Sequence, residues 1–137
     1  MPPSTVLIVE EDADVRQIVY RTLADAAYRV YEAGNGEEAL AVLRLVRGPV
    51  DLAFLDIGLP DRKGLALAYE LQALNSSQKI LLTSGDLHWI AALAREVDGA
   101  QLTTWPMLPK PFGPDVLLAA VAAALAAPAV SPEPKTR

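Results

Sequence analysis

Short apolar runs alternate with stretches of helical periodicity along most of the chain. Residues 6–9 form a continuous run of aliphatic side chains, which is typical of a strand buried on both faces. The next stretch repeats its apolar side chains at helical spacing, and Asp12 or Asp14 can cap its first turn. The alternation recurs, which predicts strands at residues 6–9, 28–33, 52–55, 80–83 and about 104–108, each followed by a helix.

This order of elements predicts an α/β fold with a doubly wound parallel sheet, five helices on its two faces and right-handed crossovers. The fourth helix is expected at about residues 87–97, and the fifth opens at residues 113–115 with a proline in its first turn. Pro106 lies within the fifth predicted strand. Because proline cannot donate to a ladder, this strand is expected at a sheet edge.

The 137 residues amount to one domain, residues 1–127, with a flexible, proline-rich tail at residues 128–137. The chain has no cysteine, which excludes disulfides, thiol nucleophiles and cysteine-based zinc sites. Its net charge of −5 argues against a nucleic-acid-binding face. No apolar run is long enough to span a membrane, so we expect a cytoplasmic protein. The dispersed arginines are expected on solvated faces; they are Arg16, Arg21, Arg29, Arg44 and Arg47.

Four of the predicted strands end in side chains of complementary chemistry. Because the carboxyl ends of parallel strands share one edge of a sheet, these side chains are expected to converge. Carboxylates without cysteine or paired histidines make an oxygen-only site suited to Mg²⁺ or Mn²⁺. A carboxylate beside such a cation can attack phosphorus, so we expect a pocket able to form an aspartyl phosphate. Its members are Glu10, Glu11, Asp56, Thr83 and Lys110.

These residues lie in motifs through which the sequence resembles the response regulator receiver domains of two-component signalling, the CheY-like domains. The resemblance covers about residues 5–127. It implies a flavodoxin-like sheet of five parallel strands in the order 2-1-3-4-5. The motifs are residues 6–12, residues 51–61 with Gly64, residues 82–85 and residues 110–112.

The resemblance implies a role for each matching residue. Asp56 is expected to accept a phosphoryl group from a histidine kinase or phosphotransfer protein, and Lys110 to pair with the carboxylate and then with the phosphate. Thr83 matches the switch hydroxyl that moves to bond the phosphoryl oxygen. The bond between Lys110 and Pro111 is cis in similar domains.

The resemblance also implies a metal site and an output surface. Glu10, Glu11, Asp56 and the backbone carbonyl of Gly58 are expected to hold Mg²⁺, with Mn²⁺ as a possible substitute. The domain is expected to act as a stand-alone receiver rather than an enzyme. It would signal to an unknown downstream protein, or form a homodimer, through the fourth helix, fifth strand and fifth helix.

Other classes of protein share parts of this pattern. A haloacid-dehalogenase-like phosphatase also uses an aspartate and Mg²⁺, but it requires a second acid where Gly58 stands. A flavodoxin-like cofactor binder needs a phosphate loop where this chain has acids. A pseudo-receiver would lack Asp56 or Lys110, and both are present. The alternative that the chain is a receiver domain excised from a hybrid histidine kinase stays open.

Four positions and one segment depart from the family pattern. Glu11 replaces the usual aspartate; it either reaches the metal through a water or a shifted rotamer, or weakens Mg²⁺ binding. Met107 replaces an aromatic switch residue, and extra length at about residues 98–104 predicts a non-standard partner surface with Trp105 as its contact residue. Gly58 and Gly85 predict a pocket open to water.

Overall fold

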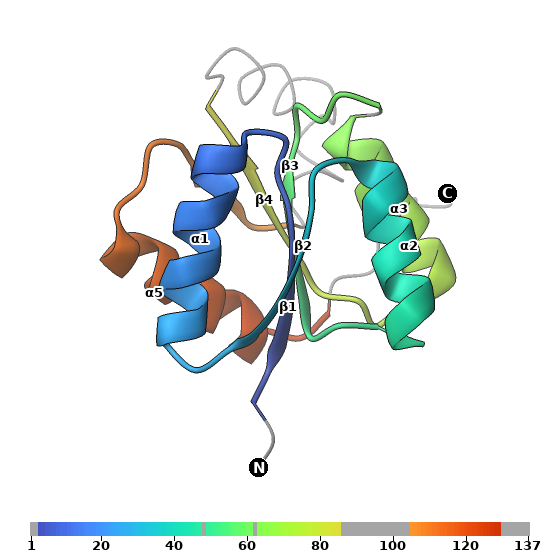
Figure 1. Ribbon diagram of the computed structural model, residues 1–137. Helices are drawn as coiled ribbons and strands as arrows, with labels where there is room; N and C mark the ends of the chain where they lie inside the picture. Colours follow the sequence, from blue (N-terminus) through green and yellow to red (C-terminus); the bar gives the residue numbers. More distant parts are fainter. Residues whose placement is uncertain (1–2, 48, 62, 86–104, 130–137) are drawn as a thin grey trace, which may run out of the picture.

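The computed structural model describes residues 3–47, 49–61, 63–85 and 105–129 (Figure 1). Within these ranges the chain forms a five-stranded sheet with four helices. The fourth predicted helix, the extra length at residues 98–104 and most of the predicted tail lie outside them. The elements are β1 (Thr5–Val9), α1 (Ala13–Asp25), β2 (Arg29–Ala33), α2 (Gly36–Val46), β3 (Leu52–Asp56), α3 (Gly64–Leu74), β4 (Ile80–Ser84), β5 (Met107–Pro109) and α5 (Pro114–Ala126).

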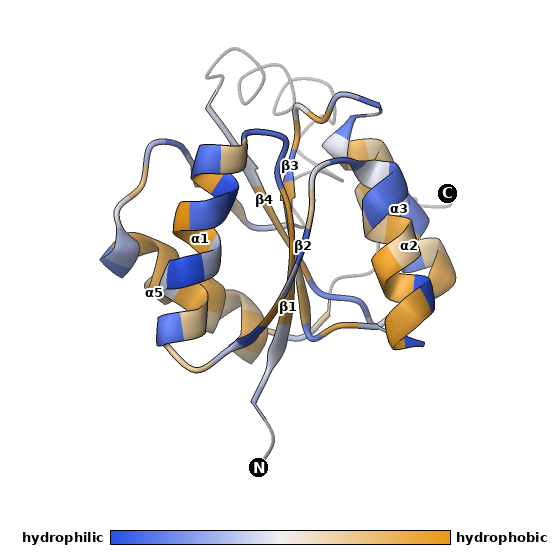
Figure 2. Ribbon diagram, in the orientation of Figure 1, coloured by the Kyte–Doolittle hydropathy of each residue, from blue (hydrophilic) through white to orange (hydrophobic). Residues whose placement is uncertain are grey.

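The sheet has the strand order β2-β1-β3-β4-β5, and every neighbouring pair is parallel. The predicted doubly wound, flavodoxin-like topology is therefore confirmed. Helices α1 and α5 cover one face of the sheet, and α2 and α3 cover the other (Figure 1). In Figure 2 the central strands are hydrophobic, whereas hydrophobic and hydrophilic residues alternate along α1.

Each sheet face has its own hydrophobic core, which explains the continuous apolar runs of the central strands. In β1, Leu7 and Val9 pack on the side of α2 and α3, while Val6 and Ile8 pack on the side of α1 and α5. All four are essentially inaccessible to solvent. A strand between two helical layers has no polar face, because alternate side chains enter opposite cores.

The edge strand β5 begins later than the sequence pattern predicts. Pro106 precedes the strand, and its carbonyl oxygen accepts a hydrogen bond of 2.9 Å from the Leu82 amide. The predicted strand at residues 104–108 is thus corrected to Met107–Pro109. Proline can accept a ladder hydrogen bond but cannot donate one, and β5 does lie at the edge of the sheet.

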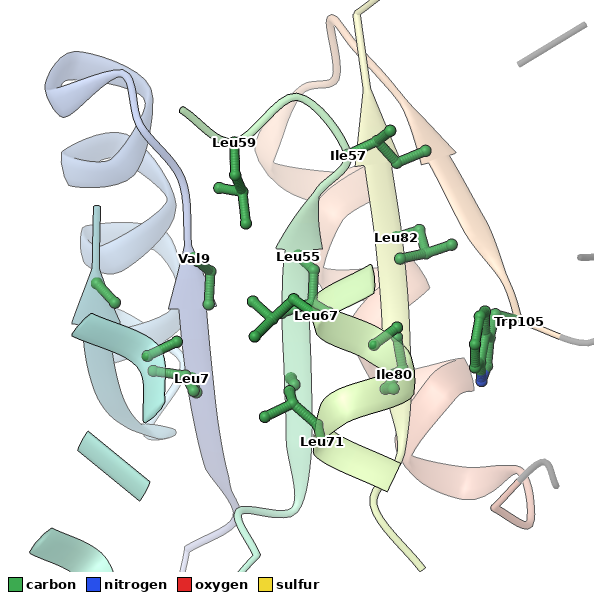
Figure 3. Packing of buried hydrophobic residues seen from close by; sticks show 14 of the residues in the cluster. Leu7, Val9, Leu55, Ile57, Leu59, Leu67, Leu71, Ile80, Leu82 and Trp105 are labelled. Atoms are coloured by element: carbon green, nitrogen blue, oxygen red, sulfur yellow. The ribbon is translucent and has the colours of Figure 1, made fainter. Parts of the chain in front are cut away.

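Trp105 is a core residue and not a contact for a partner. Only 3% of its surface is exposed, and its ring packs edge-on against Tyr69 with centroids 5.0 Å apart. Figure 3 shows Trp105 at one side of the hydrophobic cluster, next to Ile80 and Leu82. The expectation that Trp105 forms part of a partner surface is therefore wrong.

The loops at the carboxyl ends of the strands are fixed by local caps and one close backbone approach. Asp12 caps α1, because its Oδ1 accepts the amides of Asp14 and Val15. A Cβ at Gly64 would overlap the carbonyl oxygen of Asp56, so only glycine lets α3 begin this close to the end of β3. No helix in the described part of the chain is long and apolar enough to cross a membrane.

Candidate phosphoacceptor site

The site residues predicted from the sequence lie at the carboxyl edge of the sheet. In Figure 1 the strands β1, β3 and β4 end toward the top of the picture. Glu10 directly follows β1, and Asp56 is the last residue of β3. Thr83 lies in β4 beside Asp56, and Lys110 directly follows β5. The Lys110–Pro111 peptide bond is cis, as the resemblance implies.

One ammonium group joins the two buried carboxylates. Lys110 Nζ lies 2.7 Å from Glu10 Oε1 and 3.0 Å from Asp56 Oδ2. Glu10 is only 4% exposed and Asp56 only 8% exposed. Two carboxylates this close repel each other, so the shared ammonium stabilises an arrangement that would otherwise be unfavourable.

Backbone amides hold the other oxygen of each carboxylate. Glu10 Oε2 accepts the Asp12 amide at 3.1 Å, and Asp56 Oδ1 accepts the Gly58 amide at 3.0 Å. Each carboxylate therefore has one oxygen on Lys110 and one on the loop that follows its own strand. These paired hydrogen bonds fix the orientation of both side chains.

Burial and charge shift two pKa values in this cluster. Burial raises the pKa of Glu10; the hydrogen bond from Lys110 opposes this shift, and the neighbouring Asp56 carboxylate adds to it. Burial alone would lower the pKa of Lys110, but its contacts with Glu10 and Asp56 outweigh burial and raise it. Lys110 therefore stays protonated at neutral pH and supplies the cation of the cluster.

The Thr83 hydroxyl is buried and is engaged with β5 rather than with the acids. Thr83 pairs with Asp56 in the register of β3 and β4, so the two residues are neighbours across the sheet. Its Oγ1 donates a 2.6 Å hydrogen bond to the carbonyl oxygen of Leu108. The Thr83 hydroxyl therefore links the neighbourhood of Asp56 to β5, one of the two edge strands of the sheet.

The structure brings together only part of the predicted metal-ligand set. Glu10 and Asp56 share Lys110, but Glu11 is exposed, and the described residues contain no group of three or more acidic or histidine side chains arranged to hold a metal. The donor set nevertheless suits Mg²⁺, which binds oxygen, retains several waters and needs only one or two protein carboxylates. Glu10 and Asp56 meet that requirement.

Two further residues shape the site, and the sequence pattern did not single out a role for either. Arg16 donates from Nη1 to the carbonyl oxygen of Glu10 at 2.6 Å, and its side chain is only 23% exposed, so the expectation that Arg16 lies on a solvated face is wrong. Asp61 accepts the amides of Gly36 and Glu37, at 2.9 and 3.0 Å, and so anchors the β3–α3 loop to the start of α2. The sequence does contain one indication of the role of Arg16, because this residue lies one helical turn after the capping Asp12.

Comparison with known proteins agrees with the geometry. Residues 6–122 match the family described as response regulator receiver domain. The sensor kinase CckA of Brucella abortus is 34% identical over 109 residues, which cover 80% of this chain and 11% of CckA. The chain spans between 11% and 49% of the length of six curated relatives that it matches.

Solved structures of receiver proteins superpose over most of the chain. A putative response regulator from Chloroflexus aurantiacus is 30% identical, with a TM-score of 0.74 and coverage of 91% of this chain and 99% of that one. The response regulator TrrA from Thermotoga maritima, solved in complex with Mg²⁺ and beryllofluoride, is 28% identical, with a TM-score of 0.71 and coverage of 88% and 98%. The parallel sheet, its acidic edge and these matches define a two-component signalling domain. The chain belongs to the response regulator receiver domain family.

Proposed function

We propose that this receiver domain accepts a phosphoryl group on Asp56 from a phosphohistidine of a histidine kinase or phosphotransfer protein. The observation that carries the proposal is the contact of Asp56 with Lys110 at 3.0 Å, in a cluster that also holds Glu10. A buried carboxylate at a strand end, next to a protonated lysine, is suited to attack phosphorus and to tolerate the charge that arrives.

The proposed transfer forms one bond and breaks one. A carboxylate oxygen of Asp56 attacks the phosphorus, and the bond between phosphorus and the histidine nitrogen breaks. The electron pair of that bond stays on the imidazole nitrogen, which then takes up a proton. The product is an acyl phosphate on Asp56. The Lys110 ammonium then pairs with the phosphoryl oxygens in place of the free carboxylate.

We further propose that the site works with Mg²⁺, held by Glu10, Asp56 and the carbonyl oxygen of Gly58, with Mn²⁺ as a substitute. When bound, the cation neutralises charge on the transferring phosphoryl group. Glu11 is exposed, and we propose that it contacts the hydrated cation through water. The similarity to TrrA, which was solved with Mg²⁺ and beryllofluoride, supports this assignment.

The proposed output runs through Thr83 and β5. On phosphorylation the Thr83 hydroxyl would leave the Leu108 carbonyl oxygen and donate to a phosphoryl oxygen instead. The loss of this hydrogen bond would alter the position of β5 and of the face of α5 beside it. Met107 is half-buried against the core and stands where similar domains carry the aromatic switch residue, so the proposed output does not use an aromatic switch. An unknown downstream protein, or a second copy of the chain, would read this face.

Membership of the receiver family supports a proposal for the wider role of the domain in signalling. The domain would act as a phosphoacceptor, with no catalysis beyond its own phosphorylation and slow dephosphorylation, in the cytoplasm and without binding nucleic acid.

Beryllofluoride, which mimics a phosphoryl group, tests the proposed site directly. Added with Mg²⁺, it should shift the backbone amide resonances of Asp56, Gly58, Thr83 and Lys110. The Asp56→Asn variant should show none of these shifts, because a carboxamide does not bond beryllium as a carboxylate does. Equal shifts in Asp56→Asn would overturn the assignment of Asp56.

A further inference from the structure

Arg16 on α1 makes polar contacts with the backbone that carries the acidic side chains. Its Nη1 donates to the carbonyl oxygen of Glu10 at 2.6 Å and to that of Glu11 at 3.3 Å. The Arg16 side chain is 23% exposed, so most of it is covered. Through this guanidinium, α1 holds two successive peptide groups of the loop after β1.

These contacts decide where the Glu10 side chain lies. With the carbonyl oxygen of Glu10 held by Arg16, the chain turns so that the Asp12 amide donates back to Glu10 Oε2 at 3.1 Å. The other oxygen, Glu10 Oε1, is then 2.7 Å from Lys110 Nζ. The orientation of Glu10 therefore depends on a peptide geometry that Arg16 fixes.

Arg16 is itself anchored to the edge strand β2. Its Nε donates to Glu32 Oε1 at 3.2 Å. A Cβ at Gly34 would lie 3.2 Å from Arg16 Nη1, so the guanidinium packs closely against the chain after β2. The planar guanidinium supplies several donors in a fixed arrangement, which a lysine at this position would lack.

We propose that Arg16 is a positioning residue of the phosphoacceptor site: it holds the loop after β1 so that Glu10, and with it the bound cation, is correctly placed. This inference rests on the proposed function. Loss of this positioning role would change the affinity for the cation in the opposite direction to loss of the Arg16 charge alone. Removing a positive charge near an acidic cluster strengthens cation binding by simple electrostatics, whereas loss of positioning weakens it.

The test compares Mg²⁺ affinity in four proteins by titration calorimetry. Arg16→Met removes the guanidinium and its N–H donors. Arg16→Lys keeps the positive charge but lacks the planar arrangement of donors. The matched control is Arg21→Met, which removes an exposed arginine from the same helix. We expect Arg16→Met to bind Mg²⁺ about tenfold more weakly, as is typical when a group that orients a metal ligand is lost. Arg16→Lys should fall in between, and Arg21→Met should bind as tightly as the wild type or slightly more tightly.

Two other readouts separate positioning from a general loss of structure. At saturating Mg²⁺ the rate of Asp56 phosphorylation in Arg16→Met should recover to near the wild-type value. Hydrogen exchange of the Asp12 amide should be faster in Arg16→Met than in Arg21→Met, while amides in the core strands keep their protection.

Equal Mg²⁺ affinity in Arg16→Met and Arg21→Met, with wild-type phosphorylation intact, would overturn the positioning role and leave the proposed function standing. A wild-type protein that neither binds Mg²⁺ nor becomes phosphorylated would overturn the proposed function and this inference with it.

Discussion

Thr83 donates its hydroxyl to the backbone carbonyl oxygen of Leu108 over 2.6 Å, and Thr83 is also the residue paired with Asp56 in the sheet. A single side chain therefore connects the neighbourhood of the Asp56 carboxylate, the proposed phosphoryl acceptor, with β5. A contact that must break for the hydroxyl to reach a phosphoryl group is a natural point at which modification of Asp56 can affect β5.

Replacing Thr83 with valine should uncouple β5 from the acceptor. Asp56 and Lys110 are unchanged in this variant, so Asp56 should still be phosphorylated. The free energy of unfolding should fall by about 1 kcal/mol, because the Leu108 carbonyl loses a buried donor. The amide shifts of Leu108 on beryllofluoride binding should be much smaller than in the wild type. Thr83→Ser, which keeps the hydroxyl, is the control; wild-type shifts in Thr83→Val would contradict the switch role.

The raised pKa of Glu10 predicts a pH-dependent stability with a definite sign. Because burial favours the protonated form, Glu10 contributes stability fully below its ordinary pKa of 4.5, and this contribution is lost as the pH rises through the raised pKa. Glu10→Gln carries no titrating group at this position. In metal-free buffer the wild type should therefore lose stability relative to Glu10→Gln between pH 4.5 and neutrality. Denaturant titrations over this range measure the difference; a wild type that gains on the variant would show the opposite sign.

Glu11→Asp tests whether the departure from the family pattern matters. The Glu11 side chain is exposed and lies outside the pair bridged by Lys110. If it contacts the cation through water, shortening it by one methylene should change the Mg²⁺ dissociation constant by less than about threefold, well under 1.4 kcal/mol. Glu11→Gln, which removes the charge, should weaken binding more. A large gain in Mg²⁺ affinity in Glu11→Asp would show instead that the natural glutamate impairs the metal site.

Gly58 should control how fast water reaches the acyl phosphate. A Cβ at this position would lie 3.8 Å from Asp56 Oδ1, an ordinary contact, so a side chain fits there without strain. Gly58→Asn should slow dephosphorylation several-fold by screening the phosphoryl group. Gly113→Asn, at an open position before α5, is the control. An unchanged lifetime in Gly58→Asn, measured as loss of labelled phosphate, would show that access at this position does not limit hydrolysis.

The sequence was sufficient to predict the sheet because each central strand enters two cores. The continuous apolar runs at residues 6–9 and 52–55 have no other simple explanation, and polar residues at their ends indicate the functional edge. The start of β5 was misplaced because Pro106 interrupts the pattern while its carbonyl still joins the neighbouring strand.

Side-chain direction and long-range contacts could not be predicted in the same way. Glu10 and Glu11 are identical in type and adjacent, yet one is buried on Lys110 and the other is exposed, a difference set by the loop geometry. Arg16 acts on backbone carbonyl oxygens, which every residue has, so no residue pattern marks its partners. Asp61 reaches amides of α2 that lie 24 and 25 residues away in the chain.

The most direct test of the central claim is the intact mass of the protein after incubation with acetyl phosphate and Mg²⁺. We predict that the wild type gains the mass of one phosphoryl group. Asp14→Asn, which alters an exposed acid in the first turn of α1, should gain it too. Asp56→Asn should gain none. Phosphorylation of Asp56→Asn to the wild-type extent would contradict the assignment of Asp56 as the phosphoryl acceptor.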